Sequence, residues 1–113
     1  MTKDKVVLVP FPFGDLTSSK VRPAVVRTDP IGEHRHIVIA FITSQLPTSP
    51  LDSDLILDAS HPDFAKTGLR VASALRLHRL LTVTTTLVQR ELGELSPALS
   101  KQVAVKPKQL FAL

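Results

Sequence analysis

Residues 21–26, VRPAVV, and residues 37–45, IVIAFITSQ, each join a run of β-type apolar side chains to a polar group at one end. Arg22 stands where the first run begins, and Thr43 stands where the second run ends. The turn residues 29–33 (DPIGE) lie between the runs, so we expect a hairpin. In an antiparallel pair the start of one strand lies beside the end of the other. Arg22 and Thr43 are therefore predicted to meet at one edge of a small sheet.

This pair of side chains suits a phosphate group. An arginine offers a planar fork of charged donors, and a threonine adds a hydroxyl donor. The alternative is that Arg22 forms a structural salt bridge and that Thr43 merely ends a strand.

Short β-type runs, separated by proline and glycine turns, flank the hairpin on both sides. The apolar patterns predict strands over residues 6–11, 24–27, 36–42, 54–57, 70–77 and 80–83. Pro10 and Pro12 lack a backbone N–H, so the first run must end there or lie at a sheet edge. Several short strands with few helices favour a small, mostly β barrel.

Helical signals lie in the second half of the chain. Residues 59–67 indicate a turn or a short helix, and Thr84 is predicted to cap a helical turn that Gly93 ends. A C-terminal helix is expected from Ser96, its N-cap, to about residue 113, with a proline in its first position. Pro107 is expected to break or kink that helix.

Composition indicates one globular domain over residues 1–113, with 43% hydrophobic residues and a net charge of +4. No apolar run is long enough for a membrane helix, no signal peptide is evident, and cysteine is absent, so a cytosolic location is expected. Basic residues cluster at Lys20/Arg22/Arg27, Arg70/Arg76/Arg79 and Lys101/Lys106/Lys108. Together with the Arg22/Thr43 edge, these clusters favour nucleic acid over a small acidic metabolite.

The sequence lacks the usual signatures of metal, nucleophilic and cofactor chemistry. The four histidines show no HExxH spacing, and neither a GxSxG turn, a P-loop nor a Rossmann glycine pattern occurs. We therefore expect no metal and no cofactor. RNA needs neither, because its own 2′-hydroxyl can attack the adjacent phosphate while the protein aligns the attack and stabilises the developing charge. Arg22 would contact the non-bridging oxygens, and Thr43 would donate a further hydrogen bond.

Three blocks of the sequence match a known family. Residues 6–16 (VVLVPFPFGDL) with 20–26 (KVRPAVV) resemble the N-terminal half of MazF/PemK-type toxins, and residues 42–45 (ITSQ) resemble the second motif of that family. Residues 73–80 (SALRLHRL) with 92–96 (LGELS) are similar to its third block. The likeness covers nearly the whole chain, in order.

The resemblance implies a small SH3-like barrel of the MazF/CcdB/PemK type with a C-terminal helix, acting as a homodimer. It implies a sequence-specific, metal-independent endoribonuclease that cuts single-stranded RNA, such as mRNA, and is silenced by a cognate antitoxin. The catalytic arginine and threonine of the family fall on Arg22 and Thr43. The predicted RNA-binding residues are Ser18, Ser19, Lys20, Ser44, Gln45 and Arg76, the last of which could instead serve a dimer interface.

The chain departs from the family at one point that bears on chemistry. Some members carry an acidic residue in the loop before the catalytic arginine, where this chain has Ser18, Ser19 and Lys20. The resemblance therefore supplies no general base. Two other functions remain open: a binding protein of the same fold that lost catalysis or inhibits a gyrase, and a plain structural domain.

Overall fold

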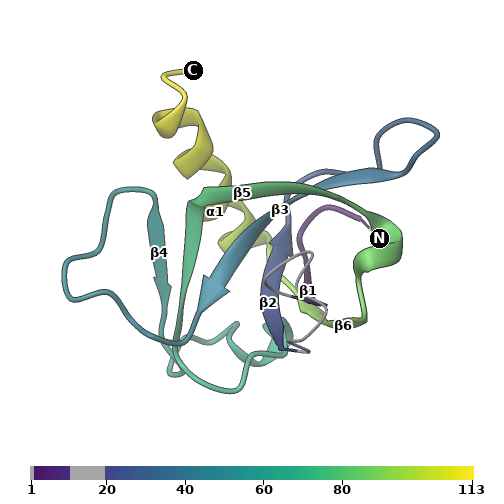
Figure 1. The fold of residues 1–113 in the computed structure, drawn as a ribbon. Coiled ribbons are helices and arrows are strands. Elements are labelled where there is room, and N and C mark those ends of the chain that lie inside the picture. Colours follow the sequence, from purple (N-terminus) through teal and green to yellow (C-terminus); the bar gives the residue numbers. More distant parts are fainter. Residues whose placement is uncertain (1, 11–19) are drawn as a thin grey trace.

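The computed structural model describes residues 2–10 and 20–113, which form one curled antiparallel sheet with a helix across it (Figure 1). The strand order is β4-β5-β3-β2-β1-β6. The strands are β1 (Lys5–Pro10), β2 (Val21–Val26), β3 (His36–Thr43), β4 (Asp54–Leu57), β5 (Ser73–Thr84) and β6 (Arg90–Glu94). Two 3₁₀ turns, η1 (Ala65–Thr67) and η2 (Thr85–Leu87), and the helix α1 (Pro97–Leu110) complete the fold. The prediction of a small, mostly β barrel with a C-terminal helix is confirmed, with the sheet curled into a half-barrel.

Apolar side chains are buried on both faces of the sheet, in two clusters. The cluster beneath α1 contains Val6, Val25, Ala40, Ile42, Leu57, Phe64, Leu75, Leu77, Leu95, Leu99 and Val103. The cluster on the other face contains Val7, Val9, Ala24, Val26, Ile37, Ile39 and Val83. Neighbours in the sequence such as Val6 and Val7 fall in different clusters, because successive side chains of a strand point to opposite faces.

The C-terminal helix begins where the sequence predicts and continues past its internal proline. Ser96 is the N-cap, and its side chain accepts a hydrogen bond from the backbone N–H of Leu99 at 3.2 Å. The expected break at Pro107 is wrong, because α1 runs on to Leu110. The backbone N–H of Phe111 still donates to the Pro107 carbonyl at 2.9 Å, so the last turn keeps its hydrogen bonding beyond the proline.

The helical turn expected from Thr84 to Gly93 is present only in part: η2 begins directly after Thr84 but ends at Leu87, and the Thr84 side chain makes no capping hydrogen bond. This segment contains only η2, followed by β6, which pairs with β1. Gly93 does not end a helix but lies in β6, where a β-carbon would come within 2.2 Å of the Lys66 carbonyl oxygen. The glycine therefore allows η1 to approach β6 closely. β1 lies between β2 and β6, so the alternative that this run lies at a sheet edge is wrong. Residue 11, the last of the predicted run, and Pro12 lie outside the described residues.

β5 is a single strand of 12 residues, where the sequence predicts two. Its register against β3 shifts between the pairs Ala40↔Leu80 and Ile42↔Leu75, so residues 76–79 of β5 lie opposite Phe41 alone. After this bulge, the apolar side chains of β5 point to the opposite face of the sheet. Leu75 and Leu77 pack beneath α1, whereas Leu81 and Val83 belong to the other cluster.

Candidate functional site

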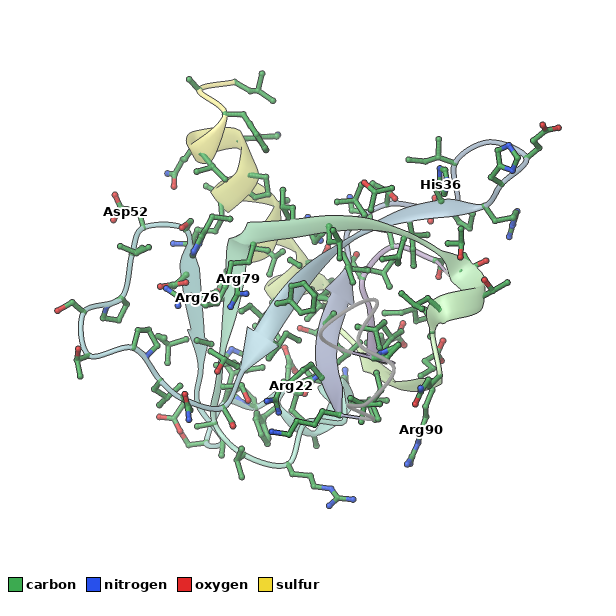
Figure 2. The ribbon with its side chains drawn as sticks, in the orientation of Figure 1. Arg22, His36, Asp52, Arg76, Arg79 and Arg90 are labelled. Carbon is green, nitrogen blue, oxygen red and sulfur yellow. The ribbon has the colours of Figure 1, made fainter. Side chains whose placement is uncertain are left out.

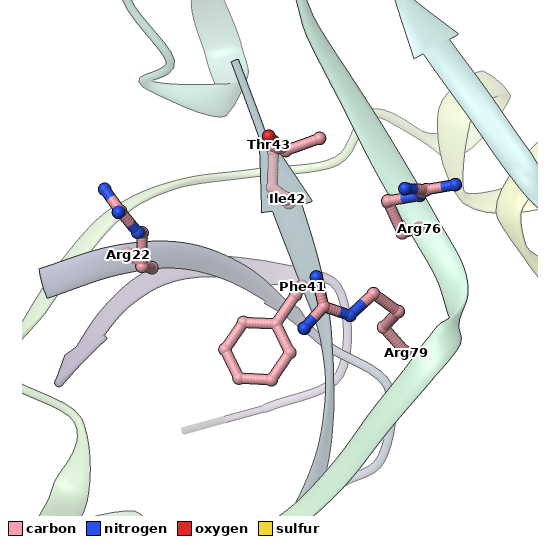
Figure 3. Close-up of a pocket in the computed structure, with 6 residues that line it drawn as sticks. All are labelled: Arg22, Phe41, Ile42, Thr43, Arg76 and Arg79. Carbon is pink, nitrogen blue, oxygen red and sulfur yellow. The ribbon is translucent and has the colours of Figure 1, made fainter. Parts of the chain in front are cut away.

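A small cavity of about 80 Å³ opens where β2, β3 and β5 lie side by side. It is lined by Arg22, Phe41, Ile42, Thr43, Arg76 and Arg79, which Figure 3 shows in close-up. The cavity has room for several water molecules or a small anionic group. Three of its lining residues are arginines, so its net charge, and hence its affinity for anions, depends on which of the three are neutralised by neighbouring residues.

The hairpin places Arg22 and Thr43 together, as the sequence predicts. β2 and β3 pair antiparallel with Ala24 opposite Phe41. Extending this register by two residues puts Arg22 beside Thr43, and both side chains line the cavity. A local hairpin thus brings a cation and a hydroxyl to one point on the sheet.

The Arg22 side chain is exposed at the start of β2, opposite Val9 of β1. Within residues 2–10 and 20–113, no ion pair or hydrogen bond engages its guanidinium. Arg27, from the same basic cluster, differs, because its Nη1 lies 3.2 Å from Oδ1 of Asp4. Among the described residues, the Arg22 guanidinium therefore keeps its charged donors unpaired, whereas Arg27 is engaged by Asp4.

The Thr43 hydroxyl is held in place by the backbone that follows it. Its Oγ1 accepts a hydrogen bond from the N–H of Gln45 at 3.1 Å. With this lone pair occupied, the hydroxyl hydrogen remains available to donate. Ser44 and Gln45 are exposed directly after Thr43, and Lys20 is exposed directly before β2. Ser18 and Ser19 lie outside the described residues.

Arg76 lines the same cavity, but an aspartate neutralises its charge. Its Nε donates to Oδ1 of Asp54 at 2.9 Å, and its Nη2 donates to Oδ2 at 3.2 Å. The Asp54 side chain is fully buried, and the N–H of Leu51 also donates to Oδ2 at 2.9 Å. Burial raises the pKa of Asp54, but the hydrogen bonds and charge of Arg76 and the Leu51 N–H outweigh it, so the pKa lies below 3.8. Arg76 therefore links β5 to β4 through Asp54, and its charge is compensated without any ligand.

Arg79 is a cavity residue that reasoning from the sequence missed. Its guanidinium carbon lies 5.7 Å from the centroid of the Phe41 ring, within the range of a cation–π contact. The sequence signal was its place in the basic cluster with Arg70 and Arg76. That cluster does not reveal which of the three cations reaches the cavity.

The described lining of the cavity contains neither a carboxylate nor an imidazole. Elsewhere in the described ranges, no three histidine, cysteine or acidic side chains gather in a group that could hold a metal ion. No helix among the described residues has the length and apolar character needed to cross a membrane.

Comparison with known proteins decides the family. A family model described as a PemK-like, MazF-like toxin of type II toxin–antitoxin systems matches residues 3–111. This chain belongs to that family. No curated protein sequence gives a significant match to this PemK/MazF-like toxin.

Solved structures share the fold of this PemK/MazF-like toxin. The Mycobacterium tuberculosis toxin MazF-mt6 aligns with a TM-score of 0.72 at 18% identity, over 96% of this chain and 97% of the other. An endoribonuclease in complex with its cognate antitoxin, from a mycobacterial species, aligns with a TM-score of 0.70 at 13% identity, over 100% and 96%. At these identities the likeness concerns the fold.

Proposed function

We propose that this PemK/MazF-like toxin is an endoribonuclease that cleaves single-stranded RNA at the Arg22/Thr43 pair. One observation carries the proposal: a guanidinium with no partner among the described residues and an oriented hydroxyl line one cavity. Membership of the toxin family supports it, as does the likeness in fold to a protein described as an endoribonuclease. The substrate class follows from the chemistry, because RNA supplies the attacking hydroxyl itself.

The reaction consists of an attack within the substrate. The 2′-oxygen of one nucleotide bonds to the adjacent phosphorus and releases its proton to solvent water, while the bond from phosphorus to the 5′-oxygen breaks and that oxygen takes a proton from solvent. The products are a 2′,3′-cyclic phosphate and a 5′-hydroxyl. Arg22 would stabilise the negative charge on the non-bridging oxygens, and Thr43 would donate a hydrogen bond to one of them. We assign these residues alignment and charge stabilisation only, since the described lining offers no group to accept the 2′-hydroxyl proton.

The same proposal names the partners of the protein. Lys20, Ser44 and Gln45 are exposed beside the catalytic pair and would contact flanking nucleotides, as would Ser18 and Ser19. A net charge of +4 suits RNA and also an acidic antitoxin segment that competes for the same surface. We further propose that the protein acts as a homodimer, and that an mRNA substrate places it in the cytoplasm.

Purified protein should cut a long single-stranded transcript in the presence of EDTA, because no step requires a metal ion. Mapping the cleavage site then allows a short RNA to be made with one 2′-deoxy nucleotide at that site. The deoxy substitution should abolish cleavage, and the unmodified RNA should yield a cyclic phosphate and a 5′-hydroxyl, detectable by mass spectrometry. Cleavage of the deoxy substrate, or a dependence on added metal, would contradict the mechanism. Growth arrest with intact RNA would instead favour a toxin that binds a protein target.

Thr43→Val should lower kcat by about 100-fold, which is typical for the loss of one hydrogen-bond donor to a developing oxyanion. Valine keeps the branched shape of threonine but can neither donate to the phosphate nor accept from the Gln45 N–H. Thr43→Ser keeps the hydroxyl and should stay close to wild type in the same single-turnover assay. Equal activity of the valine variant would remove Thr43 from the site.

A further inference from the structure

We propose that Arg79, held over the ring of Phe41, binds an RNA phosphate adjacent to the one that is cleaved and so positions the substrate. The inference rests on the proposed function and adds a residue that neither the sequence motifs nor the family match assigns. Arg79 would be a positioning residue, because the cleaved phosphate is assigned to Arg22 and Thr43.

The bulge in β5 brings Arg79 to the cavity. Residues 76–79 have only Phe41 opposite them in β3, and Arg79 ends this insertion beside the regular pair Ala40↔Leu80. Figure 3 shows the Arg79 guanidinium over the Phe41 ring, while the Arg22 guanidinium is directed away from that ring. Both arginines line the cavity, one from β2 and the other from β5.

The charges of the three arginines differ in how they are compensated. Arg76 is neutralised by the buried Asp54 through two hydrogen bonds. Arg79 is exposed, and among the residues that the structure describes it has an aromatic ring as its partner and no carboxylate. Two uncompensated cations, Arg22 and Arg79, therefore share one small cavity with no acidic group in its described lining.

A phosphodiester chain fits this arrangement better than a single small anion. Like charges in one cavity repel each other, and an anion at each guanidinium relieves that repulsion. An RNA strand carries one anion per nucleotide, so neighbouring phosphates can satisfy both cations. The cation–π contact restrains the Arg79 side chain while its N–H edges remain able to form a bidentate pair with phosphate oxygens. We therefore assign Arg22 the cleaved phosphate and Arg79 its neighbour.

The first test measures the binding of a short RNA made uncleavable by one 2′-deoxy nucleotide, at a series of salt concentrations. Each phosphate contact with a single strand contributes about 0.7 to the slope of log K against log salt. Arg79→Ala should reduce the slope by about that amount and weaken binding severalfold at low salt. Arg79→Lys keeps the charge and should keep the slope. Arg90→Ala removes an exposed arginine of β6, away from the cavity, and should leave both quantities unchanged (Figure 2).

The second test identifies the phosphate. Each phosphate of the RNA is replaced in turn by an uncharged methylphosphonate. At one position next to the cleavage site, this replacement should weaken binding to the wild type as much as Arg79→Ala does, with no further loss when both changes are combined. For the unmodified RNA, Arg79→Ala should raise KM and leave kcat nearly unchanged.

The outcomes separate this inference from the proposed function. A wild-type protein that cleaves RNA, together with an Arg79→Ala variant of unchanged slope and affinity, would overturn the role of Arg79 alone. Additive losses at every methylphosphonate position would overturn it too, because they show that Arg79 contacts none of these phosphates. A folded wild-type protein that neither binds nor cleaves RNA would overturn both proposals.

Discussion

Replacing Arg22 by alanine should lower the rate of RNA cleavage by about 1000-fold without unfolding the protein. A single donor to a developing oxyanion contributes about 10²–10³ to kcat, and Arg22 adds a full positive charge to its donors. Its side chain is exposed and forms no ion pair or hydrogen bond with the described residues, so its removal opens no cavity in the core. The measurement is single-turnover cleavage of the mapped RNA, with circular dichroism and thermal unfolding to verify the fold.

Two matched variants separate charge from geometry in this experiment. Arg22→Lys keeps a positive charge but loses the planar fork, and we expect an activity between those of the wild type and the alanine variant. Arg90→Ala also removes one exposed arginine and should cleave at the wild-type rate (Figure 2). If Arg22→Ala retained activity within a few-fold of wild type, the catalytic site would lie elsewhere.

Asp54→Asn should lower the free energy of unfolding by about 2–3 kcal/mol. Breaking a fully buried ion pair costs about 3–5 kcal/mol, and the smaller value applies because a quarter of the Arg76 side chain is exposed (24%). In the wild type, Arg76 and the Leu51 N–H both donate to the carboxylate. An asparagine NH₂ group faces Arg76 Nε at the Oδ1 position, or Arg76 Nη2 and the Leu51 N–H at the Oδ2 position, so at least one hydrogen bond is replaced by repulsion.

The control for this variant is Asp52→Asn, which changes an exposed carboxylate two residues earlier in the chain. Its effect on stability should stay within about 0.5 kcal/mol. Urea unfolding of the three proteins gives both differences. Equal stability of the wild type and Asp54→Asn would show that the Asp54–Arg76 pair contributes nothing net.

The same pair predicts how stability depends on pH. The pKa of Asp54 in the folded protein lies below its ordinary value of 3.8, so the folded state binds fewer protons at this group than the unfolded state. The stabilisation is therefore complete above pH 3.8 and is lost as the pH falls through the folded pKa. We expect the stability difference between the wild type and Asp54→Asn to be constant near neutral pH and to shrink in acid. A difference that stayed constant throughout the acid range would contradict the assignment.

The parts of the fold that local sequence signals specify agree with the structure. The hairpin of residues 21–43 follows from two apolar runs and one turn, and it places Arg22 beside Thr43 without help from distant segments. The N-cap at Ser96 is equally local, since a single side chain and the next turn of backbone form it. One failed prediction, the break at Pro107, concerns a local signal. The failed prediction at Gly93 involves contacts between distant segments. Glycine is typical of the residue that follows a helix, but Gly93 pairs with Val6 of β1 and is a strand residue, and its lack of a side chain allows the close approach of Lys66 and Thr67.

The candidate site likewise has one part that local sequence predicts and another that depends on the pairing of distant strands. The proposed catalytic pair, Arg22 and Thr43, could be predicted from residue order, because antiparallel pairing brings the start of one strand beside the end of the next. Residue order could not predict which of the cavity arginines are neutralised by a carboxylate. The sequence predicts two strands in this region, yet the structure has one, whose bulge opposite Phe41 turns Leu75 and Leu81 to different faces and carries Arg79 into the cavity. Asp54, 22 residues before Arg76 in the chain, neutralises that arginine only because β4 pairs with β5. Residue order thus indicates the type of chemistry that we propose, and long-range strand pairing determines which cations remain uncompensated among the described residues.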